Sequence, residues 1–154
     1  MVKKPDWKTH EEDMVSLLGG RGTKASGAGW YDKGDGKHDL SSVTPLLWDC
    51  KCTASDKYAI NAETWFKLEK EAMHRTPVLF VRFAERADIA VMDSSFAYRL
   101  GIVTNDIPRV KRTLSATSEV PCVVEVDTPF GIPKPLACLS LEDFGERYAR
   151  LVHE

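Results

Sequence analysis

An apolar run in the first third of the chain carries an acid and a lysine two positions apart. The run spans residues 46–53 and reads Leu-Leu-Trp-Asp-Cys-Lys-Cys-Thr. Because side chains alternate between the two faces of a β-strand, Asp49 and Lys51 would share one face, and Trp48 and Cys50 the other. One face therefore suits a protein core, and the other presents two charges. This pair is either an ordinary ion pair on a solvent-facing strand or part of a site in which the acid binds a divalent metal and the ammonium contacts a phosphate.

The segment upstream of this run predicts a short helix over residues 9–20. Thr9 and Glu12 have the spacing of a capping box, and two glycines follow the last apolar residue. Glu11 has no capping role, and at helical spacing it lies in line with Leu18 and the other apolar residues. A carboxylate on the buried side of a helix is costly unless it is paired or binds a metal, so Glu11 is a candidate site residue.

The stretch between this helix and the apolar run is rich in glycine and charged residues. Residues 21–40 therefore predict a long loop that leads into a strand near residues 37–43. Asp35 and Asp39 are candidate site residues in this stretch, and a solvated turn aspartate is the alternative for either. The stretch also carries four basic residues that we expect beside the Asp49 site: Arg21, Lys24, Lys33 and Lys37.

The overall charge of the chain is mildly acidic, which is unusual for a protein that binds nucleic acid. The formal net charge is -2, whereas nucleic-acid-binding domains usually have a basic face. Acidic site residues account for part of this deficit, and the basic residues are grouped. A second basic group, formed by Arg109, Lys111 and Arg112, either contacts phosphates or is solvated surface charge.

The order of these features resembles the PD-(D/E)XK nuclease superfamily, and within it the archaeal-type Holliday junction resolvases and their phage-encoded relatives. The resemblance covers roughly residues 9–85, with weaker similarity over residues 65–72 and 77–83. It rests on four motifs: Glu11 ahead of Leu17-Leu18-Gly19, then Ser26-Gly27-Ala28, Lys33-Gly34-Asp35 and Asp49-Cys50-Lys51-Cys52-Thr53. The family usually has Glu where this chain has Asp49. Its first aspartate corresponds to Asp35 or Asp39, and we favour Asp35.

The resemblance implies a metal-dependent, structure-specific DNA endonuclease that hydrolyses phosphodiester bonds in four-way junctions. Asp35, Asp49 and the backbone carbonyl of Cys50 would hold Mg²⁺, for which Mn²⁺ can substitute. Glu11 would support the metal shell or a second ion. Lys51 would position the attacking water and stabilise the charge that develops on the phosphate.

Two further roles follow from the same resemblance. Ser26 would contact the scissile backbone from a loop, and symmetric cutting of a junction implies a homodimer, because one domain offers only one site. The expected dimer contacts are the helix after Asn61, the edge of the strand over residues 78–83 and the segment after Ile89.

Two other functions stay open beside the junction resolvase. The first is another nuclease of the same superfamily, acting in DNA repair or recombination on flapped or single-stranded DNA. The second is a catalytically silent DNA-binding module that keeps the fold.

The order of predicted elements favours an α/β fold in a single domain. With 154 residues, the chain is long enough for one core. Strands that alternate with helices predict a central mixed β-sheet flanked by helices. The resemblance implies that this sheet is a restriction-endonuclease-like core over about residues 9–100, with a C-terminal elaboration over residues 101–154. No signal peptide or membrane-spanning run is evident. We therefore expect a soluble cytoplasmic protein, which as a phage-encoded relative would act in the host cell.

The cysteines are expected to be free thiols on the core side of their strands.

Apolar patterning predicts the elements downstream of the Asp49 strand. The predicted elements are a helix capped by Asn61 and running to about His74 with Trp65, Leu68 and Ala72 on one face, a strand over residues 78–83, a strand over residues 89–92, a helical turn over residues 95–100, a long loop or subunit-contact segment over residues 101–117, a hairpin of residues 120–126 and 136–139, and a last helix capped by Ser140 with Asp143 at its third position.

Overall fold

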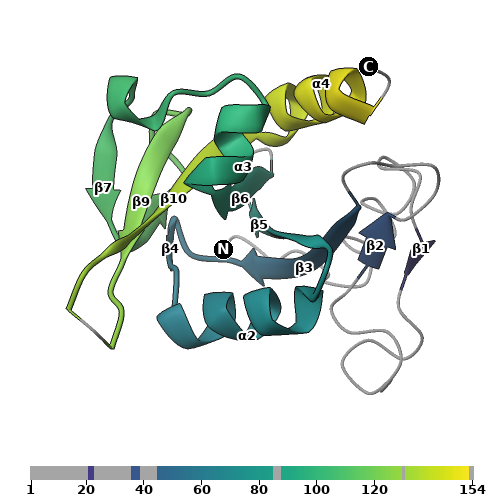
Figure 1. Ribbon diagram of the computed structural model, residues 1–154. Coiled ribbons are helices and arrows are strands. Elements are labelled where there is room, and N and C mark those ends of the chain that lie inside the picture. Colours follow the sequence, from purple (N-terminus) through teal and green to yellow (C-terminus); the bar gives the residue numbers. More distant parts are fainter. Residues whose placement is uncertain (1–20, 23–35, 39–44, 85–87, 130, 153–154) are drawn as a thin grey trace.

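The computed structural model describes residues 21–22, 36–38, 45–84, 88–129 and 131–152. These residues form a mixed eight-stranded β-sheet and a separate two-stranded sheet (Figure 1). The strands of the large sheet, in spatial order, are β1 (Arg21–Gly22), β2 (Gly36–His38), β3 (Leu46–Thr53), β5 (Thr76–Phe83), β6 (Ile89–Asp93), β10 (Lys134–Ser140), β9 (Cys122–Val126) and β7 (Arg109–Lys111).

Helices lie on both faces of the large sheet, so the predicted α/β fold with a central mixed sheet is confirmed (Figure 1). The remaining elements are α2 (Ala62–Ala72) on one face, α3 (Ser94–Arg99) and α4 (Leu141–Val152) on the other, the single turn η1 (Thr104–Asp106), and the strand pair β4 (Lys57–Ala59) and β8 (Thr113–Ser115). None of the helices in the described part of the chain has the length and apolar character needed to cross a bilayer.

The strand that carries the acid and the lysine belongs to a crossover unit made of β3, α2 and β5. β3 and β5 pair in parallel, with Asp49 opposite Leu79. Asn61 caps α2 as predicted, because its side-chain oxygen accepts a hydrogen bond of 2.7 Å from the N–H two residues further on. The helix ends at Ala72 rather than at His74. This unit places the carboxyl end of β3 beside the amino end of the helix.

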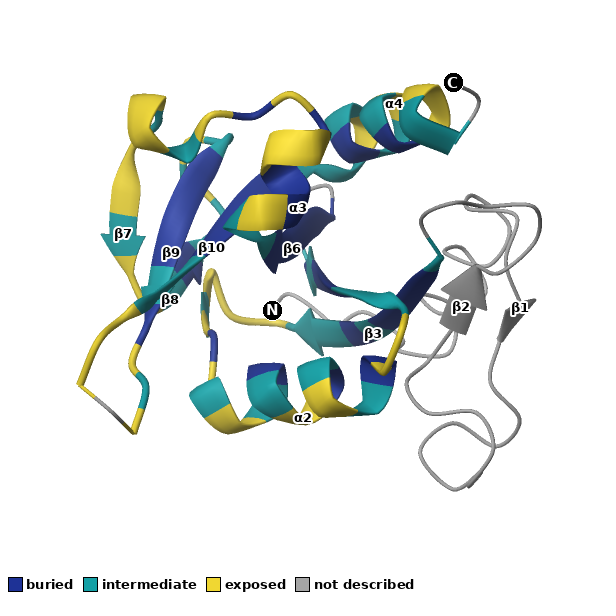
Figure 2. Ribbon diagram, in the orientation of Figure 1, coloured by how far each residue is buried: buried dark blue, intermediate teal, exposed yellow. Residues whose placement is uncertain are grey.

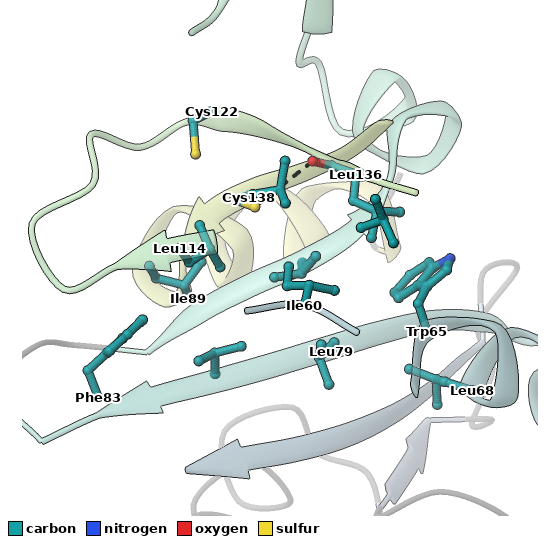
Figure 3. Close-up of a cluster of buried hydrophobic side chains, with 14 of the residues drawn as sticks. Ile60, Trp65, Leu68, Leu79, Phe83, Ile89, Leu114, Cys122, Leu136 and Cys138 are labelled. Carbon is teal, nitrogen blue, oxygen red and sulfur yellow. Dashed lines mark hydrogen bonds between the residues drawn. The ribbon is translucent and has the colours of Figure 1, made fainter. Parts of the chain in front are cut away.

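Alternate residues of the strands separate into two apolar clusters, one on each face of the sheet. Figure 2 shows that buried residues make up much of the central strands β6, β9 and β10. The cluster on the α3 and α4 side is aromatic. Phe80 of β5 makes edge-on ring contacts at 6.3 Å with Trp48 and at 5.7 Å with Phe144, and Phe144 stacks on Tyr148 at 5.8 Å. The second cluster, here called the α2-side cluster, packs Trp65 and other residues of α2 against the opposite face of the same strands (Figure 3).

The segment after α3 contains strands that the sequence did not reveal. Residues 101–117 are predicted above as a long loop or a subunit-contact segment, and the loop prediction is wrong for β7 and β8. β7 pairs in parallel with β9, and β8 pairs with β4 in antiparallel fashion. Each strand has three residues. Such a short strand shows no clear alternation, and its partner lies far away in the sequence.

The sheet topology also corrects the expected dimer contact on the strand over residues 78–83. β5 pairs with β3 on one side and with β6 on the other, so it has no open edge. The sheet then continues from β6 into β10. Residues 101–154 therefore contribute strands to the same sheet that holds β3.

The C-terminal elements follow the prediction closely. β9 and β10 form the expected hairpin, with Cys122 opposite Cys138. The Ser140 hydroxyl accepts a hydrogen bond of 3.1 Å from the Asp143 N–H at the start of α4. None of the four cysteines forms a disulfide bond, as predicted, although Cys52 is only half-buried. Burial, and then a hydrogen bond with the Cys122 thiol, raise the pKa of Cys138 well above its ordinary value, so this thiol stays protonated.

Candidate active site

Asp49 and Lys51 lie beside each other on the α2 side of β3, as the alternation predicts. We call them the charged pair. The Lys51 Nζ is 3.2 Å from the Asp49 Oδ2, and 38% of the Lys51 side chain and 22% of the Asp49 side chain are exposed. Leu47, which precedes them on the same face, is buried in the α2-side cluster. The apolar layer on this face of β3 therefore gives way to charge halfway along the strand.

A hydrogen-bonded turn at Ser55 follows β3 and leads into β4, which lies beyond the carboxyl end of β3 in Figure 1. Tyr58, in the middle of β4, is half-buried and packs against the α2-side cluster. Since Leu47 of β3 belongs to that cluster, Tyr58 lies on the same side of β3 as the charged pair.

Both members of the charged pair act on the Tyr58 hydroxyl. Burial raises the pKa of Tyr58, the Lys51 ammonium lowers it and the Asp49 carboxylate raises it, and the resulting pKa lies above the ordinary value of 10.0. The phenol is therefore neutral at physiological pH and can donate an O–H hydrogen bond.

Part of the predicted catalytic set lies in the described structure. Asp49, Cys50 and Lys51 are consecutive in β3, and the Cys50 side chain is buried in the aromatic cluster on the opposite face. Its role in the predicted site is limited to the backbone carbonyl. Six predicted site residues lie outside the described residues: Glu11, Lys24, Ser26, Lys33, Asp35 and Asp39.

The two short strands β1 and β2 bring two predicted basic positions to the β3 side of the sheet. Arg21 is paired with Lys37 across β1 and β2, and β2 is antiparallel to β3. Gly36 is opposite Trp48, the residue before Asp49. The first residue of β2 is therefore paired with the middle of β3, at the residue that comes directly before Asp49 in the sequence.

The described residues contain no group of three or more His, Cys, Asp or Glu side chains placed to hold a metal ion. Asp49 supplies one carboxylate, and carboxylate oxygens are the ligands that Mg²⁺ prefers. The other predicted carboxylate ligands lie outside the described residues. The described part of the site thus offers one side-chain donor, the Asp49 carboxylate, of the type that Mg²⁺ prefers.

Two members of the second basic group, Arg109 and Lys111, lie away from the charged pair. Arg109 and Lys111 belong to β7, which is separated from β3 in the sheet by the four strands β5, β6, β10 and β9. Arg109 is 3.9 Å from Glu125, and Arg112 is 3.6 Å from Asp127. These pairings favour the interpretation of this group as solvated surface charge that is partly neutralised by neighbouring acids.

A shallow cleft lies beside the site and not at it. It has a volume of about 490 Å³ and is lined by residues that include Ile60, Asn61, Arg112 and Asp127. The charged pair does not line this cleft. An exposed pair on the face of a strand suits an extended polymer better than a small enclosed ligand.

Comparison of the chain with protein-family models, with curated proteins and with solved structures gives no match.

Tyr58, on the same face of the sheet as the charged pair, is not singled out by the sequence pattern. Its neighbours in the sequence are Lys57 and Ala59, and its strand is three residues long. One signal was available, because an aromatic residue follows the turn after the Asp49 strand within a few positions. Only the pairing of β4 with β8 fixes its ring on the side of the charged pair.

Proposed function

We propose that this chain is a metal-dependent, structure-specific DNA endonuclease, and that its substrate is a four-way DNA junction. The observation that carries the proposal is the charged pair: an acid and a lysine, 3.2 Å apart, on one face of β3 inside a β3–α2–β5 crossover unit. The order of sequence motifs from Glu11 to Lys51 supports the same function.

Lys51 is suited to contact a DNA phosphate. Its ammonium group is attached to a rigid strand, and more than a third of the side chain is exposed at 38%. A lysine amine carries a compact positive charge, which stabilises the negative charge that builds up on a phosphate under attack. The same amine can hold a water molecule in line with the phosphorus atom. Lys51 therefore orients the nucleophile and stabilises the transition state.

Asp49 is suited to hold Mg²⁺ together with the Cys50 carbonyl and the carboxylates of Glu11 and Asp35. Asp35 precedes Gly36 in the chain, and Gly36 is opposite Trp48, the neighbour of Asp49. This adjacency favours Asp35 over Asp39 as the second aspartate of the site. When bound, the ion would lower the pKa of a water molecule and offset charge on the phosphate.

The substrate class and the assembly are part of the same proposal. Four basic residues would contact the DNA backbone around the site: Arg21, Lys24, Lys33 and Lys37. Ser26 would contact the scissile backbone. Two symmetric cuts require two sites, so we propose that a homodimer binds the junction.

The deciding experiment measures cleavage of synthetic four-way junctions with Mg²⁺ by the wild type and by Asp49→Asn. We expect the variant to lose more than about 100-fold in rate, because groups that only support a metal ligand already account for losses of that order. Binding of the junction should remain. Asp56→Asn is the matched control, because Asp56 is an exposed acid in the turn after β3. We expect this variant to cleave the junction at the wild-type rate.

Different results separate the alternatives. Full activity of Asp49→Asn would contradict the proposed mechanism. A wild type that prefers flapped or single-stranded DNA would instead support a repair or recombination nuclease. Binding without cleavage of any substrate would support a silent DNA-binding module. Parallel assays of Asp35→Asn and Asp39→Asn show which aspartate is needed for cleavage.

A further inference from the structure

Cys122 and Cys138 face each other directly across the β9–β10 hairpin. The antiparallel register pairs the two residues, so both side chains leave the same face of the sheet, and both lie in the α2-side cluster (Figure 3). The hydrogen bond with the Cys122 thiol, which contributes to the raised pKa of Cys138, agrees with this register. Neither cysteine forms a disulfide bond. Two strands therefore hold two reduced thiols opposite each other.

The backbone spacing of this pair suits a disulfide bond. The Val123 N–H donates to the Pro108 carbonyl at 2.7 Å, so the backbone groups of Val123 face β7 and those of Cys122 face β10. Cys122 and Cys138 therefore form a hydrogen-bonded pair of the antiparallel ladder, in which Cα atoms are about 5.5 Å apart. Disulfide-bonded cysteines have Cα separations of about 4.4–6.8 Å.

The same geometry makes such a disulfide easy to reduce. The Cβ atoms of opposed residues are about 4.5–5.5 Å apart, whereas a disulfide brings them to about 3.5–4.5 Å. Closing this gap strains the two strands, and strained disulfides are reduced more readily than relaxed ones. The bond is therefore expected to be reversible.

Cys122 is the member of the pair that a reagent reaches first. It is the first residue of β9, and β7 begins to pair with β9 only at Val123. Glu119, just ahead of the strand, is exposed, whereas Cys138 lies within β10, between β6 and β9. Fraying at the amino end of β9 exposes the Cys122 thiol without opening the rest of the sheet.

We propose that Cys122 and Cys138 are a site of reversible oxidation, at which a small disulfide such as oxidised glutathione converts the two thiols into a disulfide across the hairpin. The Cys122 thiolate attacks one sulfur of the reagent, forms a mixed disulfide and releases one glutathione thiolate. The Cys138 thiolate then attacks the Cys122 sulfur, forms the cross-strand bond and releases the second glutathione. The protein loses two electrons and two protons, and the reagent is reduced to two thiols. This site does not depend on the proposed nuclease function.

The test incubates the folded protein with oxidised glutathione at mildly alkaline pH, alkylates the remaining thiols after denaturation and identifies the tryptic peptides by mass spectrometry. Trypsin does not cut the Lys134–Pro135 bond, so one peptide, residues 113–147, contains both cysteines of the hairpin and no others. We expect this peptide to lose two hydrogens and to take up no alkylating reagent, and reduction before alkylation should restore both thiols. A peptide that is alkylated at both cysteines, or that carries glutathione, overturns the proposal.

Cys50 and Cys52 are the matched control pair in the same chain. They also share one face of a strand, but residues two positions apart along a strand are about 6.6–6.8 Å apart, at the outer limit for a disulfide. Cys52 is half-buried, whereas only 1% of Cys122 is exposed. We therefore expect glutathione on Cys52 and no bond between Cys50 and Cys52. A disulfide between these two residues in place of the hairpin bond overturns the proposal.

The variant Cys138→Ala separates the two steps of the reaction. Because the second thiol is missing, the mixed disulfide cannot be resolved, and we expect glutathione to remain on Cys122. Circular dichroism checks that the variant is folded. A folded variant with no glutathione on Cys122 overturns the assignment of this residue as the attacking thiol.

Discussion

Two acid–base pairs in this protein combine the same kinds of groups in different surroundings. Arg82 donates to Asp88 through Nε at 2.7 Å and through Nη2 at 3.0 Å, and only 4% of Asp88 is exposed. The backbone carbonyl of Asp88 also accepts a hydrogen bond from the Leu141 N–H at the start of α4. In the charged pair, Lys51 Nζ lies 3.2 Å from Asp49 Oδ2, and the lysine is more than a third exposed at 38%.

This difference in burial distinguishes a pair that stabilises the fold from a pair that is available to bind a ligand. A buried bidentate pair fixes two side chains at once, and losing one partner leaves an uncompensated charge. A partly exposed pair contributes less to stability, because water reaches and screens its charges. The charged pair can therefore exchange its mutual contact for a metal ion or a phosphate at small cost, whereas the Arg82–Asp88 pair cannot.

The largest effect on stability is expected for Asp88→Asn. This change leaves the Arg82 guanidinium beside a neutral amide, and we expect the free energy of unfolding to fall by about 3 kcal/mol. Urea denaturation at neutral pH measures the loss. Asp127→Asn is the matched control, because Asp127 is 71% exposed and its pairing with Arg112 is equally exposed. A loss below about 1 kcal/mol for Asp88→Asn would remove the contrast between the two pairs.

A smaller loss of stability than for Asp88→Asn is expected for Lys134→Met. The Lys134 ammonium is 2.8 Å from Asp93 and 3.4 Å from Glu69, so it joins the cap of α3 to α2. Burial alone would raise the pKa of Asp93, but the hydrogen bonds from Lys134 and Ser95 lower it below its ordinary value. We expect Lys134→Met to cost about 1 kcal/mol at neutral pH.

The Lys134–Asp93 pair makes the free energy of unfolding depend on pH, and the sign of this dependence follows from the lowered pKa of Asp93. The stability that it contributes is present above the unfolded-state pKa of about 3.9 and is lost as the pH falls through the lower folded-state pKa. Lys134→Met should therefore lose less stability than the wild type between pH 7 and pH 2. Unfolding curves of both proteins at several pH values test this, and parallel acid dependences would argue against the pairing.

The smallest effect on stability is expected for Asp49→Asn, the variant with the largest expected effect on cleavage. We expect the free energy of unfolding to change by less than about 0.5 kcal/mol, because water reaches the Lys51 ammonium and screens the pair. Thermal and urea denaturation without metal measure this change. A loss comparable to that of Asp88→Asn would show that the charged pair is a structural element, and the inactive variant would then be uninformative about catalysis.

Local patterns were enough to predict the strand that carries the charged pair. Residues 46–53 alternate clearly between apolar and charged side chains, and Asn61 and Ser140 precede helices with the spacing of caps. Each of these signals involves residues close together in the sequence. The Asp49 and Lys51 positions could therefore be predicted before the fold was known.

Long-range pairing explains what the sequence did not reveal. β7 and β8 have three residues each, and their partners β9 and β4 lie elsewhere in the chain. The position of Tyr58 depends on the same pairing of β4 with β8. The expected open edge of β5 was wrong for another reason, because the next strand in the sequence, β6, folds back and pairs with β5 along that edge. Strand neighbours are set by the whole sheet and not by the local pattern.

The place of β10 in the sheet has a consequence for how the chain is made. β10 comes last among the strands in the sequence but lies between β6 and β9, with which it pairs on its two sides. During synthesis, the ribosome therefore releases β6 and β9 before the strand that joins them. Until Lys134 and the residues after it emerge, both strands have an unpaired edge, and such edges can pair with other chains. A nascent chain of this protein is thus exposed to aggregation until its last strand is translated.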